Sequence, residues 1–80
     1  MQDQRAAIAA FLNAGFTVAT ADHSRLSAHR HPGTHIYLEA HNGVVEFTAW
    51  WDNRAKQKLS GGARSWLYAA LLAIDTADHI

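Results

Sequence analysis

Alternation of apolar and polar residues is strongest between positions 35 and 51, where two alternating runs flank Asn42-Gly43. This dipeptide is typical of a two-residue β-hairpin loop, because a type I′ turn requires positive φ at both central residues. A loop of this length sets the strand pairing. His41 is expected opposite Val44 and Ala40 opposite Val45, and the pairing continues in this way along both strands. The pattern therefore predicts a hairpin whose register is defined residue by residue.

The two faces of this hairpin differ in chemistry, because successive side chains of a strand point to opposite faces. One face is apolar and is predicted to be core: Ile36, Leu38, Ala40, Val45, Phe47 and Ala49. The other is aromatic and ionisable: His35, Tyr37, Glu39, His41, Val44, Glu46, Thr48 and Trp50. Glu39 is expected opposite Glu46, a like-charged pair that destabilises a sheet unless a cation lies nearby. We expect Arg25 or Arg30 to supply that cation; a partner protein and a bound metal are the alternatives.

A helical pattern precedes the hairpin. Residues 3–13 carry apolar side chains at helical spacing, namely Ile8, Phe11 and Leu12. Asp3 can cap the N-terminus of this helix, and Gly15 lies where a C-terminal glycine ends a helix. The sequence therefore predicts a first helix over 3–13 with these three residues as its buried stripe.

The segment between this helix and the hairpin has a weaker pattern. Residues 16–21 are mostly β-branched and small and predict a strand, and residues 22–24 have the composition of a turn. Residues 25–30 are consistent with a further strand or with an irregular loop. Residues 31–34 read His-Pro-Gly-Thr, which predicts a type II turn with Gly33 at the position that requires positive φ.

After the hairpin, residues 52–62 lose the alternation and predict a solvated loop rich in basic residues. Ser60 is expected to cap a second helix over 63–77. The predicted core stripe of this helix is Trp66, Leu67, Ala70, Leu71 and Ile74. Tyr68 and Leu72 lie off the stripe, and a helix that is apolar all round is normally buried all round. We therefore expect a homodimer with Tyr68 and Leu72 in its interface; the alternative is that the first helix covers them.

These elements predict one α+β domain spanning residues 1–80. The order is helix, three- or four-stranded antiparallel β-meander, helix, with both helices on the apolar face of the sheet as a two-layer sandwich. The chain has no cysteine and equal numbers of acidic and basic residues, 7 of each. Its longest near-apolar run, residues 66–74, is about half of the ~20 residues that span a bilayer. We expect a cytoplasmic protein without a membrane partner.

Five of the six histidines lie between positions 23 and 41. His29, His31, His35 and Glu39 are donors of the kind that zinc or iron binds, so a His-rich metal-binding protein is one alternative hypothesis. Polar surface histidines explain the same residues, and we assign no metal or cofactor. The sequence contains no cysteine nucleophile, no Gly-x-Ser-x-Gly and no phosphate-binding glycine loop, so we expect no enzyme.

Outward aromatic residues beside charges are typical of protein interfaces. The candidate partner-binding residues are Tyr37, Glu39, Glu46, Trp50, Arg54, Lys56 and Lys58. The alternative for Tyr37 and Trp50 is that residues 22–30 fold over them. A second alternative function is binding of single-stranded nucleic acid by residues 54–64 with Trp50, although the balanced charge gives that function weak electrostatic support.

In size, lack of cysteine and order of elements, the whole chain resembles the small phage-encoded inhibitors such as anti-CRISPR proteins. The resemblance is one of architecture, since these inhibitors share no residue motif. It implies a non-enzymatic protein that binds and blocks a larger protein or ribonucleoprotein, namely a bacterial defence complex of the CRISPR effector type in the host cytoplasm. It assigns no residues.

Overall fold

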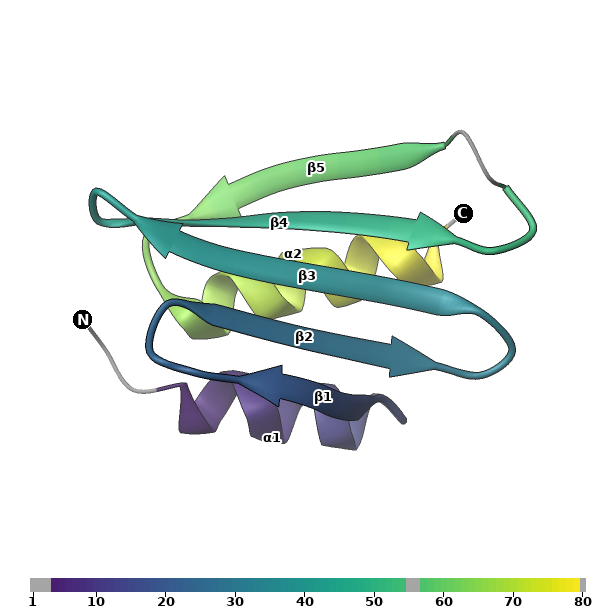
Figure 1. Cartoon of the computed structure of the whole chain (residues 1–80), viewed down its shortest axis with the longest axis horizontal. Coiled ribbons are helices and arrows are strands. Elements are labelled where there is room, and N and C mark those ends of the chain that lie inside the picture. The colour runs from purple at the N-terminus through teal and green to yellow at the C-terminus, as the bar shows by residue number, and fades with distance from the viewer. Residues whose placement is uncertain (1–3, 55–56, 80) are drawn as a thin grey trace.

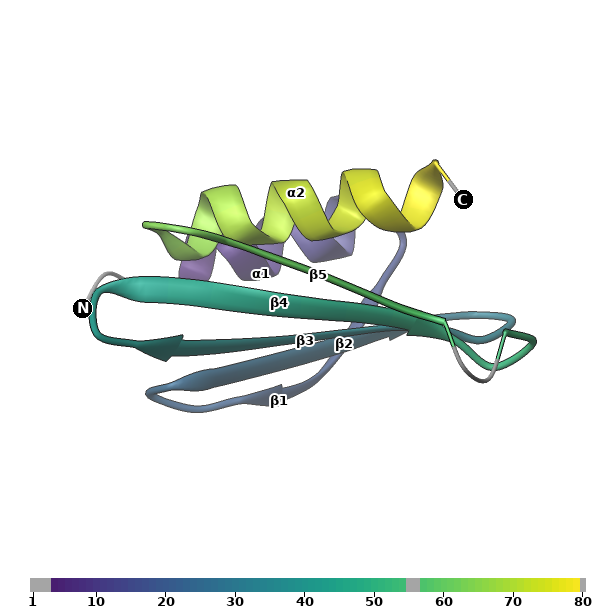
Figure 2. The same ribbon diagram turned by 90° about the horizontal axis from the view of Figure 1, so that it is seen from above.

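A computed structural model describes residues 4–54 and 57–79 and has two layers (Figures 1 and 2). The elements in chain order are α1 (Arg5–Asn13), β1 (Thr17–Ala21), β2 (Arg25–Arg30), β3 (Thr34–His41), β4 (Val44–Trp51), β5 (Lys58–Ala63) and α2 (Trp66–Asp78). The strands form one antiparallel sheet in the order β1-β2-β3-β4-β5, and both helices cover the same face of it. The predicted α+β class is confirmed, but the meander has five strands instead of three or four.

The central hairpin of β3 and β4 has the predicted turn and register. Asn42 and Gly43 have φ angles of 54° and 77°, as a type I′ turn requires. Pairing runs from His41 opposite Val44 to Thr34 opposite Trp51. The face predicted to be core is the one that the helices cover, and its fully buried members are Ile36, Leu38, Val45 and Ala49.

The additional strand, β5, lies where a solvated loop was expected. It pairs with β4 from Trp50–Lys58 to Val45–Ala63. Its glycines conceal the alternation, because Gly61 faces the core without a side chain. A Cβ atom at Gly61 would lie 2.6 Å from Cε2 of Phe47, so the Phe47 ring occupies the space that a side chain at Gly61 would need.

The N-cap of α2 is Ser65 and not Ser60, which lies within β5. Ser65 has extended backbone angles, φ −142° and ψ 156°, and its hydroxyl oxygen accepts a hydrogen bond from the N–H of Tyr68 at 3.1 Å. This is the usual N-cap arrangement. The helix therefore begins three residues later than predicted.

The orientation of α2 differs from the predicted one. Towards the sheet it buries Trp66 and four small residues, Ala69, Ala70, Ala73 and Ala77. The larger apolar residues are exposed to solvent: Leu67 by 37%, Tyr68 by 67%, Leu71 by 45% and Leu72 by 46%. The predicted burial of Leu67 and Leu71 is wrong, and so is the alternative in which α1 hides Tyr68 and Leu72. Small side chains on the buried face allow the helix axis to lie close to the strands.

The first helix is also turned relative to the prediction. Ala7 and Phe11 are its buried residues, whereas Leu12 is 56% exposed and Ile8 is partly buried. The predicted stripe is wrong at Leu12, because the contact face is centred on two residues spaced by four. Gly15 follows the helix with a φ of 84°, as expected of a C-terminal glycine. The predicted Asp3 cap lies outside the described residues.

The segment from 22 to 34 forms β2 and two turns. In the first turn, the Asp22 carboxylate accepts hydrogen bonds from the N–H groups of Ser24 and Arg25 at 3.2 and 3.1 Å. The second turn contains a cis peptide bond before Pro32, and Gly33 does not have positive φ, so the type II prediction is wrong. Gly33 instead lies close to the Asp52 side chain: a Cβ atom at position 33 would lie 2.6 Å from Oδ2 of Asp52, so a larger residue there would displace this carboxylate.

Candidate functional site

The face of the sheet opposite the helices, here called the outer face, is the candidate site. No other described element covers it, and Figure 1 looks directly onto it with both helices behind the strands. Cross-strand pairing brings the following side chains onto this face from β2 to β5: Arg25, Ser27, His29, His35, Tyr37, Glu39, His41, Val44, Glu46, Thr48, Trp50, Lys58 and Ser60. Residues 25–30 form strand β2 within the sheet, so they do not fold over Tyr37 and Trp50 as the alternative supposed.

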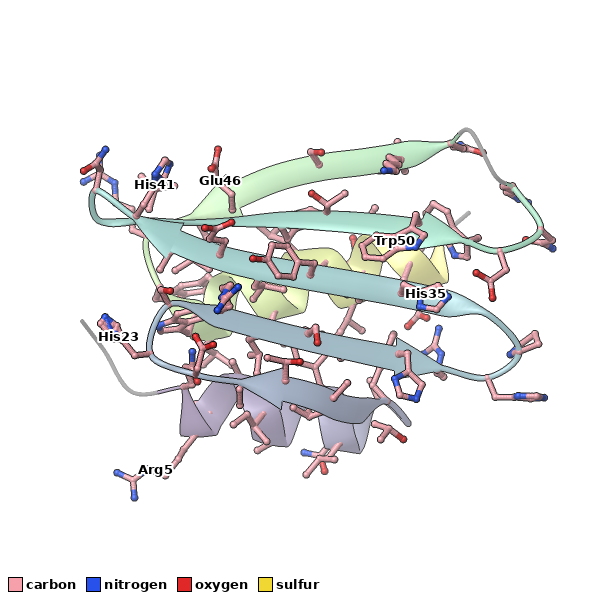
Figure 3. All side chains as sticks on the ribbon, viewed as in Figure 1. Arg5, His23, His35, His41, Glu46 and Trp50 are labelled. Carbon is pink, nitrogen blue, oxygen red and sulfur yellow. The ribbon has the colours of Figure 1, made fainter. Side chains whose placement is uncertain are left out.

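One end of the outer face holds a fixed aromatic cluster. The rings of His35 and Trp50 are stacked, with centroids 5.3 Å apart and planes inclined by 12° (Figure 3). Nε2 of His35 lies 2.8 Å from Oδ1 of Asp52, so a second contact, at the edge of the ring, holds the imidazole. Sequence reasoning placed Trp50 outward but missed Asp52. The signal was available, because Asp52 is two residues after Trp50 and alternation directs both side chains to one side.

Tyr37 lies in the middle of the outer face. Its cross-strand neighbours are the small hydroxyl residues Ser27 and Thr48. Its hydroxyl donates a hydrogen bond to Oε1 of Glu39 at 3.1 Å. Partial burial, together with this hydrogen bond and the negative charge of Glu39, raises the pKa of Tyr37 above its usual value of 10.0. The phenol is therefore a neutral donor whose hydroxyl is held in one place.

The predicted pair of facing carboxylates is present, with Glu39 opposite Glu46. Arg25 lies opposite Glu39 on the neighbouring strand, but its guanidinium forms an ion pair with Asp22, with Nη2 3.2 Å from Oδ2. Nε2 of His41 lies 3.3 Å from Oε1 of Glu46, a contact that sequence reasoning missed (Figure 3). Glu39 therefore contacts Tyr37 and Glu46 contacts His41, and the prediction that an arginine pairs with these carboxylates is not confirmed.

Arg30, the other candidate, serves a structural role at the edge of the core. Its guanidinium donates to the backbone carbonyl of Ala14 at 3.0 Å and to Asp78. It also lies 4.3 Å from the centre of the Phe16 ring. Arg30 therefore joins β2 to the C-terminal ends of α1 and α2. It does not reach the carboxylates of the outer face.

The four residues of the alternative metal site are not assembled. His29 is opposite His35 across the β2–β3 pair, but His31 lies in the following turn and Glu39 lies four residues further along β3. Within residues 4–54 and 57–79, no group of three or more histidine, aspartate or glutamate side chains is arranged to hold a metal ion.

The described basic residues of 54–64, namely Arg54, Lys58 and Arg64, do not form one patch. Lys58 is opposite Trp50 at the aromatic end of the outer face, whereas Arg64 follows the other end of β5. Arg54 lines a hollow of about 360 Å³ beyond the end of β4, together with residues 32–34, residues 51–53 and Ala77. Lys56 lies outside the described residues.

The outer face therefore has an aromatic end, a tyrosine at its centre and an acidic end. In the described part of the chain, no helix is long and apolar enough to cross a membrane. In comparisons with family models, curated proteins and solved structures, nothing matched the chain.

Proposed function

We propose that this protein is a non-enzymatic protein-binding module and that it contacts its partner through the outer face. One observation carries the proposal: a five-stranded sheet leaves one face uncovered by the other described elements, and that face holds a stacked His35–Trp50 pair beside a half-buried Tyr37. Aromatic side chains already held in place lose little conformational entropy on binding, which is why such residues anchor interfaces.

The charges of the outer face favour a protein partner over nucleic acid. Glu39 and Glu46 occupy the same surface as Trp50, and phosphate groups would be repelled by them. The cations that would hold a phosphate backbone are divided between the two ends of β5. The chain has no net charge, whereas nucleic-acid binding depends on a concentrated positive surface.

The proposed contact residues are Tyr37, Glu39, Glu46, Trp50, Arg54 and Lys58, with Lys56 as a further candidate from sequence alone. The resemblance to small phage-encoded inhibitors makes a bacterial defence complex of the CRISPR effector type the first partner to test, with the protein acting as an inhibitor in the host cytoplasm. The proposed module is a homodimer, because Tyr68 and Leu72 provide a second free surface away from the outer face.

The test uses tagged protein and three alanine variants. Trp50→Ala and Tyr37→Ala truncate the outer face, and Leu12→Ala truncates an exposed apolar residue on α1 as the matched control. Each is used for affinity capture from a lysate of the organism that encodes the chain, and against purified CRISPR effector complexes with target-DNA cleavage as the readout. If Trp50 is an anchor, its removal weakens binding by about 2 kcal/mol or more.

The expected result is a partner that wild type and Leu12→Ala retain and that both outer-face variants lose. Circular dichroism should show that all variants remain folded. Equal binding by Trp50→Ala and Tyr37→Ala would reject the outer face as the site. A captured complex that is lost after nuclease treatment, or that weakens steeply with salt, would favour nucleic acid instead.

A further inference from the structure

The solvent side of α2 has the composition of a buried surface. Four large apolar residues face outward, namely Leu67, Tyr68, Leu71 and Leu72, while the side that meets the sheet and α1 is built mainly from alanines. A surface helix of a monomeric domain normally has the opposite distribution. A contiguous apolar patch of this kind marks an interaction surface, and the question is what covers it.

The two ends of this outward face carry opposite charges. Arg64 immediately precedes the N-cap, and Asp75 lies near the C-terminus of α2, one turn after Leu71. Each residue lies at the helix end whose partial charge has the same sign as its own, because a helix N-terminus is partly positive and a C-terminus is partly negative. Neither charge is therefore favoured by its own helix. Arg64 makes no hydrogen bond or ion pair with any described residue, and Asp75 contacts His79, whose Nδ1 lies 3.1 Å from Oδ1.

We infer that this face is covered by a second copy of the chain, with the two α2 helices antiparallel about a twofold axis. Along the helix, the axis lies outside the molecule at the level midway between Ala69 and Ala70. In this register Tyr68 lies level with Leu71 of the second copy, and Leu67 lies level with its Leu72. The same twofold rotation brings Arg64 level with Asp75 of the second copy, since positions 64 and 75 are equally far along the chain from the axis.

This arrangement satisfies all the features of the face at once. The four large apolar side chains of each copy are removed from water, and two Arg64–Asp75 contacts form, one at each end. The antiparallel helices also align opposite dipoles, so each charge meets a helix end of favourable sign. A twofold contact is closed and self-complementary, as in most homodimers. It is independent of what the outer face binds.

The first measurement is the mass in solution by light scattering from micromolar to millimolar concentration. The expected mass is twice the 8.8 kDa of the chain. Leu72→Glu and Leu71→Glu should return it to the monomer, and Trp50→Ala, on the opposite side of the molecule, should leave it doubled. A wild-type mass of 8.8 kDa throughout this range overturns the inference, as does a dimer that both glutamate variants leave intact.

The second measurement tests the register by charge reversal. Arg64→Glu places two carboxylates together at each end of the dimer, and Asp75→Arg places two guanidinium groups together. Each variant alone should dimerise about tenfold more weakly, since two attractive exposed pairs become repulsive. Lys58→Glu, a matched charge reversal on the outer face, should dimerise as wild type does.

Mixing the two variants separates this register from any other. One chain carrying Arg64→Glu and one carrying Asp75→Arg form two attractive pairs, so the mixture should recover wild-type dimerisation. Within one chain the two positions are 11 residues apart, about 16 Å along a helix, so no intramolecular contact can produce this recovery. A mixture as weak as its components, or single variants that dimerise normally, overturns the register.

Discussion

At the scale of single residues, Tyr37 couples the centre of the outer face to its acidic end. The folded protein favours the neutral phenol, through partial burial and the Glu39 contact, and so binds this proton more tightly than the unfolded chain does. The associated stability is present below the unfolded pKa near 10.0 and is lost as the pH rises through the higher folded pKa. Neutral pH therefore lies well within the range in which the hydroxyl is a donor.

An ultraviolet titration of tyrosine ionisation tests this state. The difference between wild type and Tyr37→Phe should report a phenol that ionises above pH 10.0. Glu39→Gln should lower the pKa of Tyr37, because the substitution removes the negative charge that opposes phenolate formation. A Tyr37 midpoint at or below the usual value, or one that Glu39→Gln leaves unchanged, would contradict the hydrogen bond to Glu39.

Gly61 and Gly62 are adjacent in β5 but differ in the space around them. Gly61→Ala should destabilise the fold by about 1–3 kcal/mol, because its Cβ atom would meet the Phe47 ring at 2.6 Å. Gly62→Ala is the control, since its nearest neighbour is the Val45 carbonyl oxygen at 3.4 Å. Urea unfolding of both variants measures the difference, and equal stabilities would show that Phe47 does not fill the space beside Gly61.

At the scale of elements, the beginning of α2 distinguishes two serines. Ser65→Ala should lower stability by about 1 kcal/mol, because the N–H of Tyr68 loses its acceptor. Ser60→Ala should have little effect, because Ser60 is an exposed strand residue opposite Thr48. Thermal unfolding followed by circular dichroism compares them, and a larger loss for Ser60→Ala would place the cap where the sequence alone suggested.

The sequence predicted the elements whose determinants are local. The β3–β4 hairpin follows from Asn42-Gly43 and from alternation, and the outward positions of Tyr37 and Trp50 follow from the same pattern. β5 was missed because contact with Phe47 requires a glycine at position 61, which removes the alternation. The orientation of α2 was missed because a helical wheel favours large apolar residues as core, whereas this sheet is approached by alanines.

At the scale of the whole molecule, large apolar residues are divided between a buried core and an exposed helical surface. Leu38→Ala should cost about 2–5 kcal/mol of folding free energy, because this side chain is fully buried between the layers. Leu12→Ala, at an exposed position on α1, should cost less than about 1 kcal/mol. Chemical denaturation measures both, and comparable losses would mean that Leu12 belongs to the core.

The placement of both helices on one face of the sheet determines how the module can engage more than one molecule. In a dimer joined through α2, the helices lie at the centre and the two outer faces point away from each other. The two outer faces therefore cannot bind one flat target surface at the same time, so dimerisation gives no gain in avidity towards a target of that kind. Such a dimer would instead bridge two partner molecules, and a partner with several binding sites would be cross-linked.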